Sequence, residues 1–131
     1  MPPQFDLVGL TVKDMKTSLD FYRALGLAIP EGAEKEDHVE YKAGSIRLAW
    51  DTAQLIQSID PTWTPPSGGH SIGLAFLCAS PAEVDETYKY ITSLGYDGHK
   101  APWDAFWGQR YATVHDPDGN SIDLFAPLSA G

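Results

Sequence analysis

The chain has 131 residues, of which 43% are hydrophobic and 21% charged, values typical of a folded domain that can bury a core. A net charge of −9 disfavours nucleic acid as a partner, because its phosphates would be repelled. The sequence has no apolar run of about 18 residues, so we expect no transmembrane helix and no membrane partner. A basic region before an apolar one is also missing, so we expect no signal peptide. The lone Cys78 lies in an apolar run; we expect it to pack, with no disulfides and a cytoplasmic location.

An internal repeat is the most informative pattern in the chain. Its first copy begins with an apolar run at Leu7–Val12, which is typical of a strand. Asp14 follows as a candidate N-cap and Gly26 as a candidate helix stop. Apolar residues recur between them at helical spacing: Met15, Leu19, Tyr22 and Leu25.

The second copy repeats this order. A strand is predicted at Ser71–Cys78, and Ser80, Pro81 and Glu83 have the spacing of a capped helix start. Gly95 is the matching helix stop. The same stripe of apolar residues lies between these signals: Val84, Tyr88, Ile91 and Leu94. The pattern indicates a duplication.

Short strands are expected after each helix. In the first half they are Leu27–Pro30, His38–Lys42 and Ser45–Asp51, with a turn at Ala43-Gly44, and in the second half Tyr96–Lys100, Arg110–His115 and Ser121–Ala126. The second hairpin is expected to turn through Asp116–Gly119, where Pro and Gly favour a turn. The sequence therefore predicts an α+β fold of two tandem βαβββ modules within one domain, 1–131. Module one covers about 5–51 and module two about 70–127, and 52–69 is a linker rich in Pro, Gly, Ser and Thr.

Three segments carry a resemblance to a known family: VGLTVKDMKTSLDFYRALGL, LAFLCASPAEVDETYKYITSLGY and WGQRYATVHDPDGNSIDLFAP. With them the chain resembles the vicinal-oxygen-chelate superfamily, which includes glyoxalase I, extradiol dioxygenases and bleomycin-resistance proteins. The resemblance implies cupped mixed sheets that bind a ligand inside. It also implies a homodimer, with or without exchange of modules between chains.

The resemblance further implies metal ligands on the first and last strand of each half. Leu7 and Gly73 (or Ser71, two residues earlier) hold the first-strand positions, and none of them is a good donor. When SIRL is aligned with SIDL, Asp123 holds the acidic position and Arg47 its counterpart. A guanidinium has no lone pair to offer, so we expect no metal and no cofactor. Arg47 and Asp123 would instead approach each other, contact a ligand, or point to solvent.

Four histidines could in principle rebuild a metal site. They are His38, His70, His99 and His115, and their spacing matches none of the usual histidine motifs for metals. The sequence therefore disfavours a replacement site.

Aromatic residues are frequent, with four Trp, six Tyr and five Phe. Trp50 ends a predicted strand, Trp63 lies in the linker, and Trp103, Phe106 and Trp107 cluster in APWDAFWGQR. Flat aromatic faces suit a planar ligand and attract cations, and three aspartates lie near these tryptophans in sequence: Asp51, Asp60 and Asp104. Structural roles for Trp50 and Trp107 are the alternative. The candidate ligand-binding residues are Trp50, Trp63, Trp103, Phe106, Trp107, Tyr41, His38, Arg47, Tyr111 and Asp123, with no catalytic residue assigned.

This pattern resembles the metal-free, antibiotic-binding branch of the superfamily. It implies stoichiometric sequestration of a DNA-damaging antibiotic or similar polycyclic natural product, planar and possibly cationic. The alternative is a glyoxalase- or dioxygenase-like enzyme acting on a small oxygenated metabolite. Asp123 would then be a general base, with Tyr41, Tyr111 or His38 as its acid partner. A metabolite-sensing module is a third interpretation.

Overall fold

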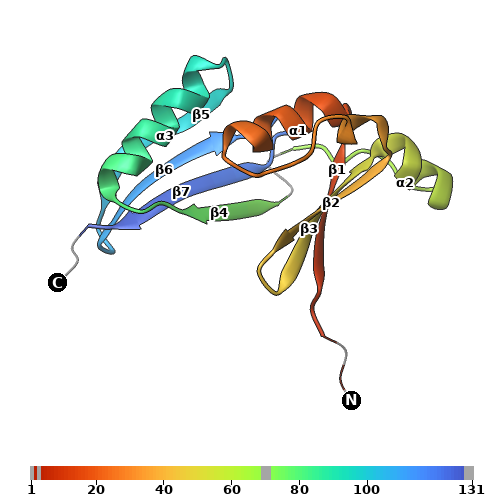
Figure 1. Ribbon diagram of the computed structural model, residues 1–131, viewed down its shortest axis with the longest axis horizontal. Helices are drawn as coiled ribbons and strands as arrows, with labels where there is room; N and C mark the ends of the chain where they lie inside the picture. Colours follow the sequence, from red (N-terminus) through yellow and green to blue (C-terminus); the bar gives the residue numbers. More distant parts are fainter. Residues whose placement is uncertain (1, 3, 69–71, 129–131) are drawn as a thin grey trace. The chain divides into compact units, whose positions relative to one another are not determined.

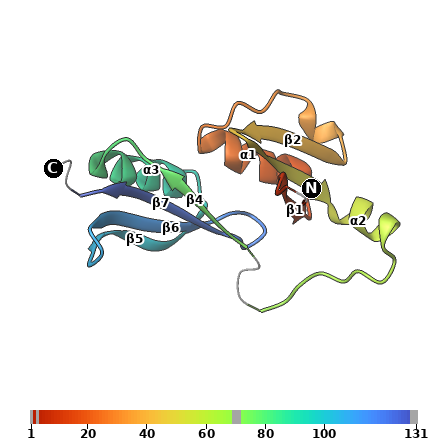
Figure 2. The same cartoon turned by 90° about the horizontal axis from the view of Figure 1, so that it is seen from below.

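The computed structural model describes residues 2, 4–68 and 72–128. The chain divides into two compact units, Met1–Pro66 and Ser67–Gly131, and each is taken by itself (Figures 1 and 2). The boundary between the units falls within the segment predicted as a linker, 52–69. Ser71 and His70 lie outside the described residues.

The first unit is a three-stranded mixed sheet with helices. Its elements in chain order are β1 (Leu7–Val12), α1 (Met15–Ala24), the short 3-10 helix η1 (Ala33–Lys35), β2 (His38–Ala43), β3 (Ile46–Thr52) and α2 (Ala53–Ile59). The strand order is β1-β3-β2, with β1 parallel and β2 antiparallel to the central strand. The β2–β3 hairpin turns at Gly44-Ser45, one residue later than predicted.

Helix α1 forms where the capping and spacing signals predict it. The Asp14 side chain accepts a hydrogen bond from the backbone N of Lys16 at 3.2 Å, and Gly26 follows the helix with φ of 108°. Leu19 and Tyr22 on the apolar stripe are fully buried, and the Tyr22 ring lies 5.2 Å from that of Trp50 on β3. The stripe therefore packs on the sheet.

One local prediction for the first half is wrong, and one segment contains a helix that was not predicted. Leu27–Pro30 does not form a strand; the Arg23 guanidinium donates hydrogen bonds to the carbonyls of Ile29 and Pro30. The segment predicted as a linker begins with α2, because the Thr52 hydroxyl accepts from the backbone N of Leu55 at 3.1 Å and caps it.

The second unit has the full strand–helix–three-strand order. It contains β4 (Gly73–Leu77), α3 (Pro81–Ser93), β5 (Asp97–Ala105), β6 (Gln109–His115) and β7 (Ser121–Pro127). The strand order is β4-β7-β6-β5, with β4 parallel to β7 and the other pairs antiparallel. The α+β fold with two mixed sheets is therefore confirmed.

Helix α3 packs on one face of this sheet, against β5, β6 and β7. Ser80 caps the helix by accepting from the backbone N of Glu83 at 3.1 Å, and the Glu83 carboxylate accepts from the backbone N of Ala79. The buried side chains of this layer are apolar: Val84, Ile91, Ala112, Val114, Ile122 and Leu124. They form the core of the unit.

The hairpins of the second unit show one confirmed and one wrong prediction. The Asp116 carboxylate accepts from the backbone N of Asp118 and Asn120 at 2.9 and 2.8 Å, and Gly119 has φ of 85°, which confirms the predicted turn. Strand β5, however, runs five residues past its predicted end at Lys100. It therefore includes Trp103, which lies beyond the predicted strand.

Cys78 is buried, and this burial raises the pKa of its thiol, in agreement with a packing role. Among the described residues, no helix is long and apolar enough to cross a membrane.

Candidate functional site

The face of the second sheet that points away from α3, called here the open face, carries a row of aromatic and apolar side chains. Successive side chains in a strand alternate between faces, so Tyr111 and Phe125 lie opposite the buried Ala112 and Leu124. Trp103 pairs with Tyr111, Tyr111 with Phe125, and Phe125 with Leu77. These four residues form the aromatic row, which crosses every strand of the sheet.

Two further aromatic residues extend the row at the β5–β6 turn. The Trp107 ring makes edge-to-face contacts with Trp103, Phe106 and Tyr111, at centroid distances of 5.5, 4.9 and 5.3 Å. Its Nε1 donates to Gln109 Oε1 at 2.7 Å, which orients the indole. Phe106 is 92% exposed and Trp107 48%. The turn thus presents apolar surface to solvent.

A polar pair lies directly beside the aromatic row. The Tyr111 hydroxyl donates to Asp123 Oδ2 at 2.6 Å, and the Thr113 hydroxyl donates to Asp123 Oδ1 at 2.9 Å. Burial and the neighbouring carboxylate raise the pKa of Tyr111 to about 12. At neutral pH this residue is therefore a protonated hydrogen-bond donor.

Strand β5 carries two charged residues near the row, an aspartate and a lysine. Asp104 pairs with Arg110 at 3.0 Å, and Arg110 also binds Asp85 on α3 at 2.9 Å, so this aspartate belongs to the helix side of the sheet. Lys100 provides a cation on the row, since its Nζ lies 4.7 Å from the centre of the Trp103 ring. Asp104 is therefore near the tryptophans in sequence but does not lie on the open face.

The first unit carries a charged network on the face of its sheet away from Trp50. His38 Nδ1 lies 2.5 Å from Asp51 Oδ1, and its Nε2 lies 2.7 Å from Glu40 Oε2. Its hydrogen bonds raise the pKa of His38, the bond to Glu40 more than the bond to Asp51. Arg47 donates to Glu40 at 2.7 Å and to Asp6, so its guanidinium already has two carboxylate partners.

The remaining candidates of the first unit do not share this face. Trp50 is fully buried against Tyr22. It is a core residue, which is the structural role that the sequence analysis gave as the alternative to ligand binding. Tyr41 alternates with His38 and Glu40 along β2 and so points to the other face. The backbone N of Trp63, beyond α2, donates to the Asp60 carbonyl at 3.0 Å. The structure thus groups Trp103, Phe106, Trp107, Tyr111 and Asp123, while the other candidates belong to the first unit.

The positions where the resemblance implies metal ligands do not suit a metal. In the first unit, Leu7 lies opposite Arg47. The leucine has no atom that can bind a metal, and the arginine is a cation. In the second unit, Gly73 lies opposite Ser121, and Asp123 lies opposite Ala75. Counted from the strand pairing, Asp123 is two pairs beyond Ser121, which holds the position equivalent to Arg47, so the alignment of SIRL with SIDL is offset by two residues. Neither pair provides a set of ligands.

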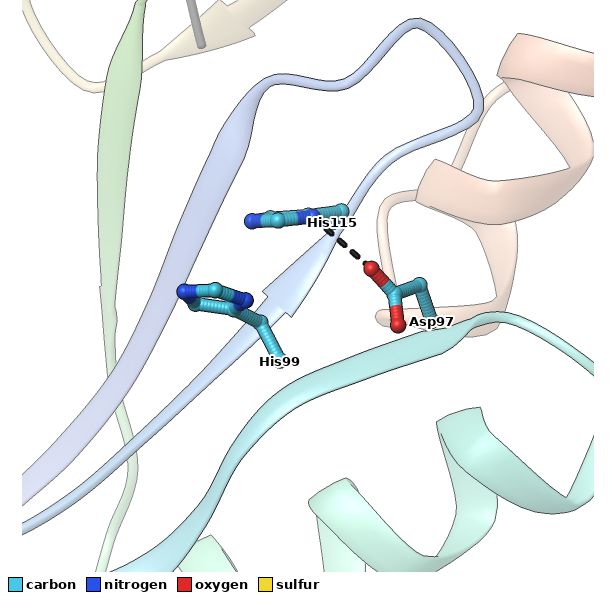
Figure 3. A group of neighbouring side chains, drawn as sticks. All are labelled: Asp97, His99 and His115. Carbon is cyan, nitrogen blue, oxygen red and sulfur yellow. Dashed lines mark ion pairs between the residues drawn. The ribbon is translucent and has the colours of Figure 1, made fainter. Parts of the chain in front are cut away.

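A different group of metal-ligating side chains lies on β5 and β6 (Figure 3). Donor atoms of Asp97, His99 and His115 all lie within 4.8 Å of one another. His115 Nδ1 is 2.8 Å from Asp97 Oδ2, and the two imidazole rings stack with centroids 4.4 Å apart. Sequence reasoning missed this group because His115 is distant in sequence from Asp97 and His99 and meets them only through strand pairing. The Asp-x-His spacing, which places two side chains on one strand face, was the available signal.

Over residues 4–124 the chain matches the family model for the Glyoxalase/Bleomycin resistance protein/Dioxygenase superfamily. The chain belongs to this superfamily. A search of curated proteins finds no match.

Several solved structures share the fold over nearly the whole chain. A glyoxalase/bleomycin resistance protein/dioxygenase from Nocardioides is 25% identical, with a TM-score of 0.77 and coverage of 100% of this chain and 87% of the other. A protein of unknown function from Agrobacterium tumefaciens is 27% identical, with a TM-score of 0.75 and coverage of 98% and 97%. A lactoylglutathione lyase from the same organism is 23% identical, with a TM-score of 0.67 and coverage of 96% and 95%. At that identity the last likeness concerns the fold alone.

Proposed function

We propose that this protein binds and sequesters a planar aromatic small molecule on the open face of its second unit, without making or breaking a bond. DNA-damaging antibiotics with fused rings are the ligand class that we infer. The observation that carries the proposal is the row of Trp103, Tyr111, Phe125 and Leu77 across the sheet, extended by Trp107.

The exposed apolar area of this surface favours binding of a flat apolar ligand. Leu77 is 69% exposed at the β4 end of the row, and Phe106 and Trp107 are exposed at the β5–β6 end. Covering apolar surface releases about 25 cal/mol per Å², and stacked aromatic pairs contribute about 0.5–1.5 kcal/mol more. Since Trp107 is held by three ring contacts and by Gln109, little side-chain freedom is lost on binding.

The polar groups beside the row narrow the ligand chemistry. The Asp123 carboxylate accepts two hydrogen bonds and has acceptor capacity left for a ligand hydroxyl or amine. Lys100 covers one side of the Trp103 ring, so a ligand that stacks there displaces it or offers it an acceptor. Phenol- or quinone-bearing aromatic rings satisfy both groups.

Titration of tryptophan fluorescence with an anthracycline and with bleomycin tests the proposal. We expect quenching that saturates at one ligand per chain, and at least about tenfold weaker binding (about 1.4 kcal/mol) in Trp107→Ala. Trp63→Ala, which removes an indole from the first unit, is the matched control and should leave the affinity unchanged. Equal affinity of wild type and Trp107→Ala would exclude this surface as the ligand site.

An enzyme is the second candidate, and the Tyr111–Asp123 pair favours it. A carboxylate beside a phenol could position a hydroxyl of an oxygenated metabolite, although a phenol with a pKa of about 12 would donate a proton only to a strong base. Incubation with lactoylglutathione tests this activity. Turnover that disappears in Asp123→Asn would support the enzyme over the sequestering protein.

A further inference from the structure

We propose that Asp97, His99 and His115 form a binding site for a borderline divalent transition-metal ion such as Zn²⁺ or Co²⁺. Its three residues differ from those at the strand positions where the superfamily resemblance implies metal ligands, although His115 pairs with Ser121, which lies opposite one of them, Gly73. The proposal does not depend on the proposed aromatic ligand.

The donor set matches this class of ion. Two imidazoles and one carboxylate are typical ligands of Zn²⁺, Co²⁺ and Ni²⁺, whereas Ca²⁺ and Mg²⁺ prefer oxygen donors. Their donor atoms already lie within 4.8 Å of one another. Three protein ligands leave at least one coordination position for water or another molecule.

The local backbone directs all three side chains to one face. A side chain at Gly98 would point toward α3, since an added Cβ would lie 2.3 Å from Tyr88 Oη and 2.6 Å from Thr92 Cγ2. The residues on either side, Asp97 and His99, therefore point to the open face. Asp97 pairs with His115 across the β5–β6 ladder, which brings the second imidazole to the same place.

The ligands can close around an ion with small movements. Tetrahedral coordination with metal–nitrogen distances of about 2.0–2.1 Å requires the donors to approach one another further than they do without metal. The Asp97 side chain is 67% exposed, and the β5–β6 register is irregular between Asp97 and Lys100. Both features permit this adjustment. The carboxylate would also offset part of the ion's charge.

The site is distinct from the aromatic row on the same face. His115 lies four residues beyond Tyr111 along β6, which corresponds to about 13 Å along a strand. Thr113 and Asp123 lie on the intervening pair. Metal binding and aromatic-ligand binding can therefore be measured, and can fail, separately.

Titration of the untagged protein with Co²⁺, followed by its visible absorption, is the test, with Zn²⁺ competition to confirm the same site. We expect one Co²⁺ per chain, displaced by Zn²⁺. His99→Ala and His115→Ala should each lower the affinity at least about tenfold, consistent with the loss of one of three ligands. Asp97→Asn should weaken binding in the same direction.

His38→Ala is the matched control. It removes a histidine that contacts two carboxylates, one at each ring nitrogen. Because these carboxylates lie on opposite sides of the ring, they cannot bind the same ion together with one of its nitrogens. This variant should keep full metal affinity. Absence of stoichiometric binding, or equal affinity in wild type, His99→Ala and His115→Ala, would overturn the proposal. Far-UV circular dichroism of each variant checks that the fold is retained.

Discussion

The Tyr111 hydroxyl donates a 2.6 Å hydrogen bond to Asp123 across the β6–β7 pair. This bond joins the aromatic row to the carboxylate of the neighbouring strand β7. Because Thr113 donates to the other oxygen, the carboxylate is held as an acceptor by two hydroxyls of its own unit.

The ionisation of Tyr111 should report this arrangement. Burial is the larger cause of its raised pKa and Asp123 the second, so Asp123→Asn should lower the pKa from about 12 while leaving it above the ordinary value of about 10. Tyrosinate absorbance, taken as the difference from Tyr111→Phe, measures it. A raised tyrosine pKa stabilises the fold below about pH 10, and this contribution is lost as pH rises through the raised value. An unchanged pKa in Asp123→Asn would contradict the contact.

His38 should titrate above its ordinary pKa of about 6.5, because Glu40 and Asp51 favour its charged form. We expect Glu40→Gln to lower the pKa of His38, measured by NMR of the imidazole protons. The control is Glu34→Gln, which removes a carboxylate partner of Arg23. It should leave the pKa of His38 unchanged.

The raised pKa of His38 makes the stability of the folded state depend on pH. A raised histidine pKa stabilises the folded state below about pH 6.5, and the contribution disappears as pH rises through the raised value. The difference in melting temperature between wild type and Glu40→Gln should therefore be larger on the acid side. A difference that grows toward alkaline pH would contradict this assignment.

Gly98→Ala should destabilise the second unit by about 1–3 kcal/mol, as overpacking does. The new methyl would collide with Tyr88 and Thr92, and the Tyr88 hydroxyl would lose its 3.1 Å bond to the Gly98 carbonyl. Gly73→Ala is the control, since its nearest atom would be 4.0 Å away. Urea denaturation of the two variants provides the comparison, and equal midpoints would refute the close contact.

Trp50→Ala should cost about 3–5 kcal/mol of unfolding free energy, as expected for a large buried aromatic. Its ring is fully buried against Tyr22, so the milder Trp50→Phe should retain the affinity for an aromatic ligand. The pair of measurements separates a core role from a binding role. Weaker ligand binding in Trp50→Phe at unchanged stability would return Trp50 to the candidate site.

The sequence alone determined the elements that depend on local spacing. Helices α1 and α3, their caps at Asp14 and Ser80 and the Asp116–Gly119 turn were predictable, because capping and hydrophobic periodicity act over a few residues. The failed strand at Leu27–Pro30 shows the limit of this reasoning. Arg23 holds the carbonyls of Ile29 and Pro30, and no local pattern reveals that contact.

Only the tertiary structure decided which residues share a face. Trp50 and Trp107 are both strand-end or turn aromatics in sequence, yet one is fully buried and the other 48% exposed. Likewise, Asp97, His99 and His115 meet only once β5 and β6 pair. The reason is physical: a shift of one residue in strand register moves every side chain to the opposite face, and irregularities such as those in β5 cannot be counted from composition or spacing.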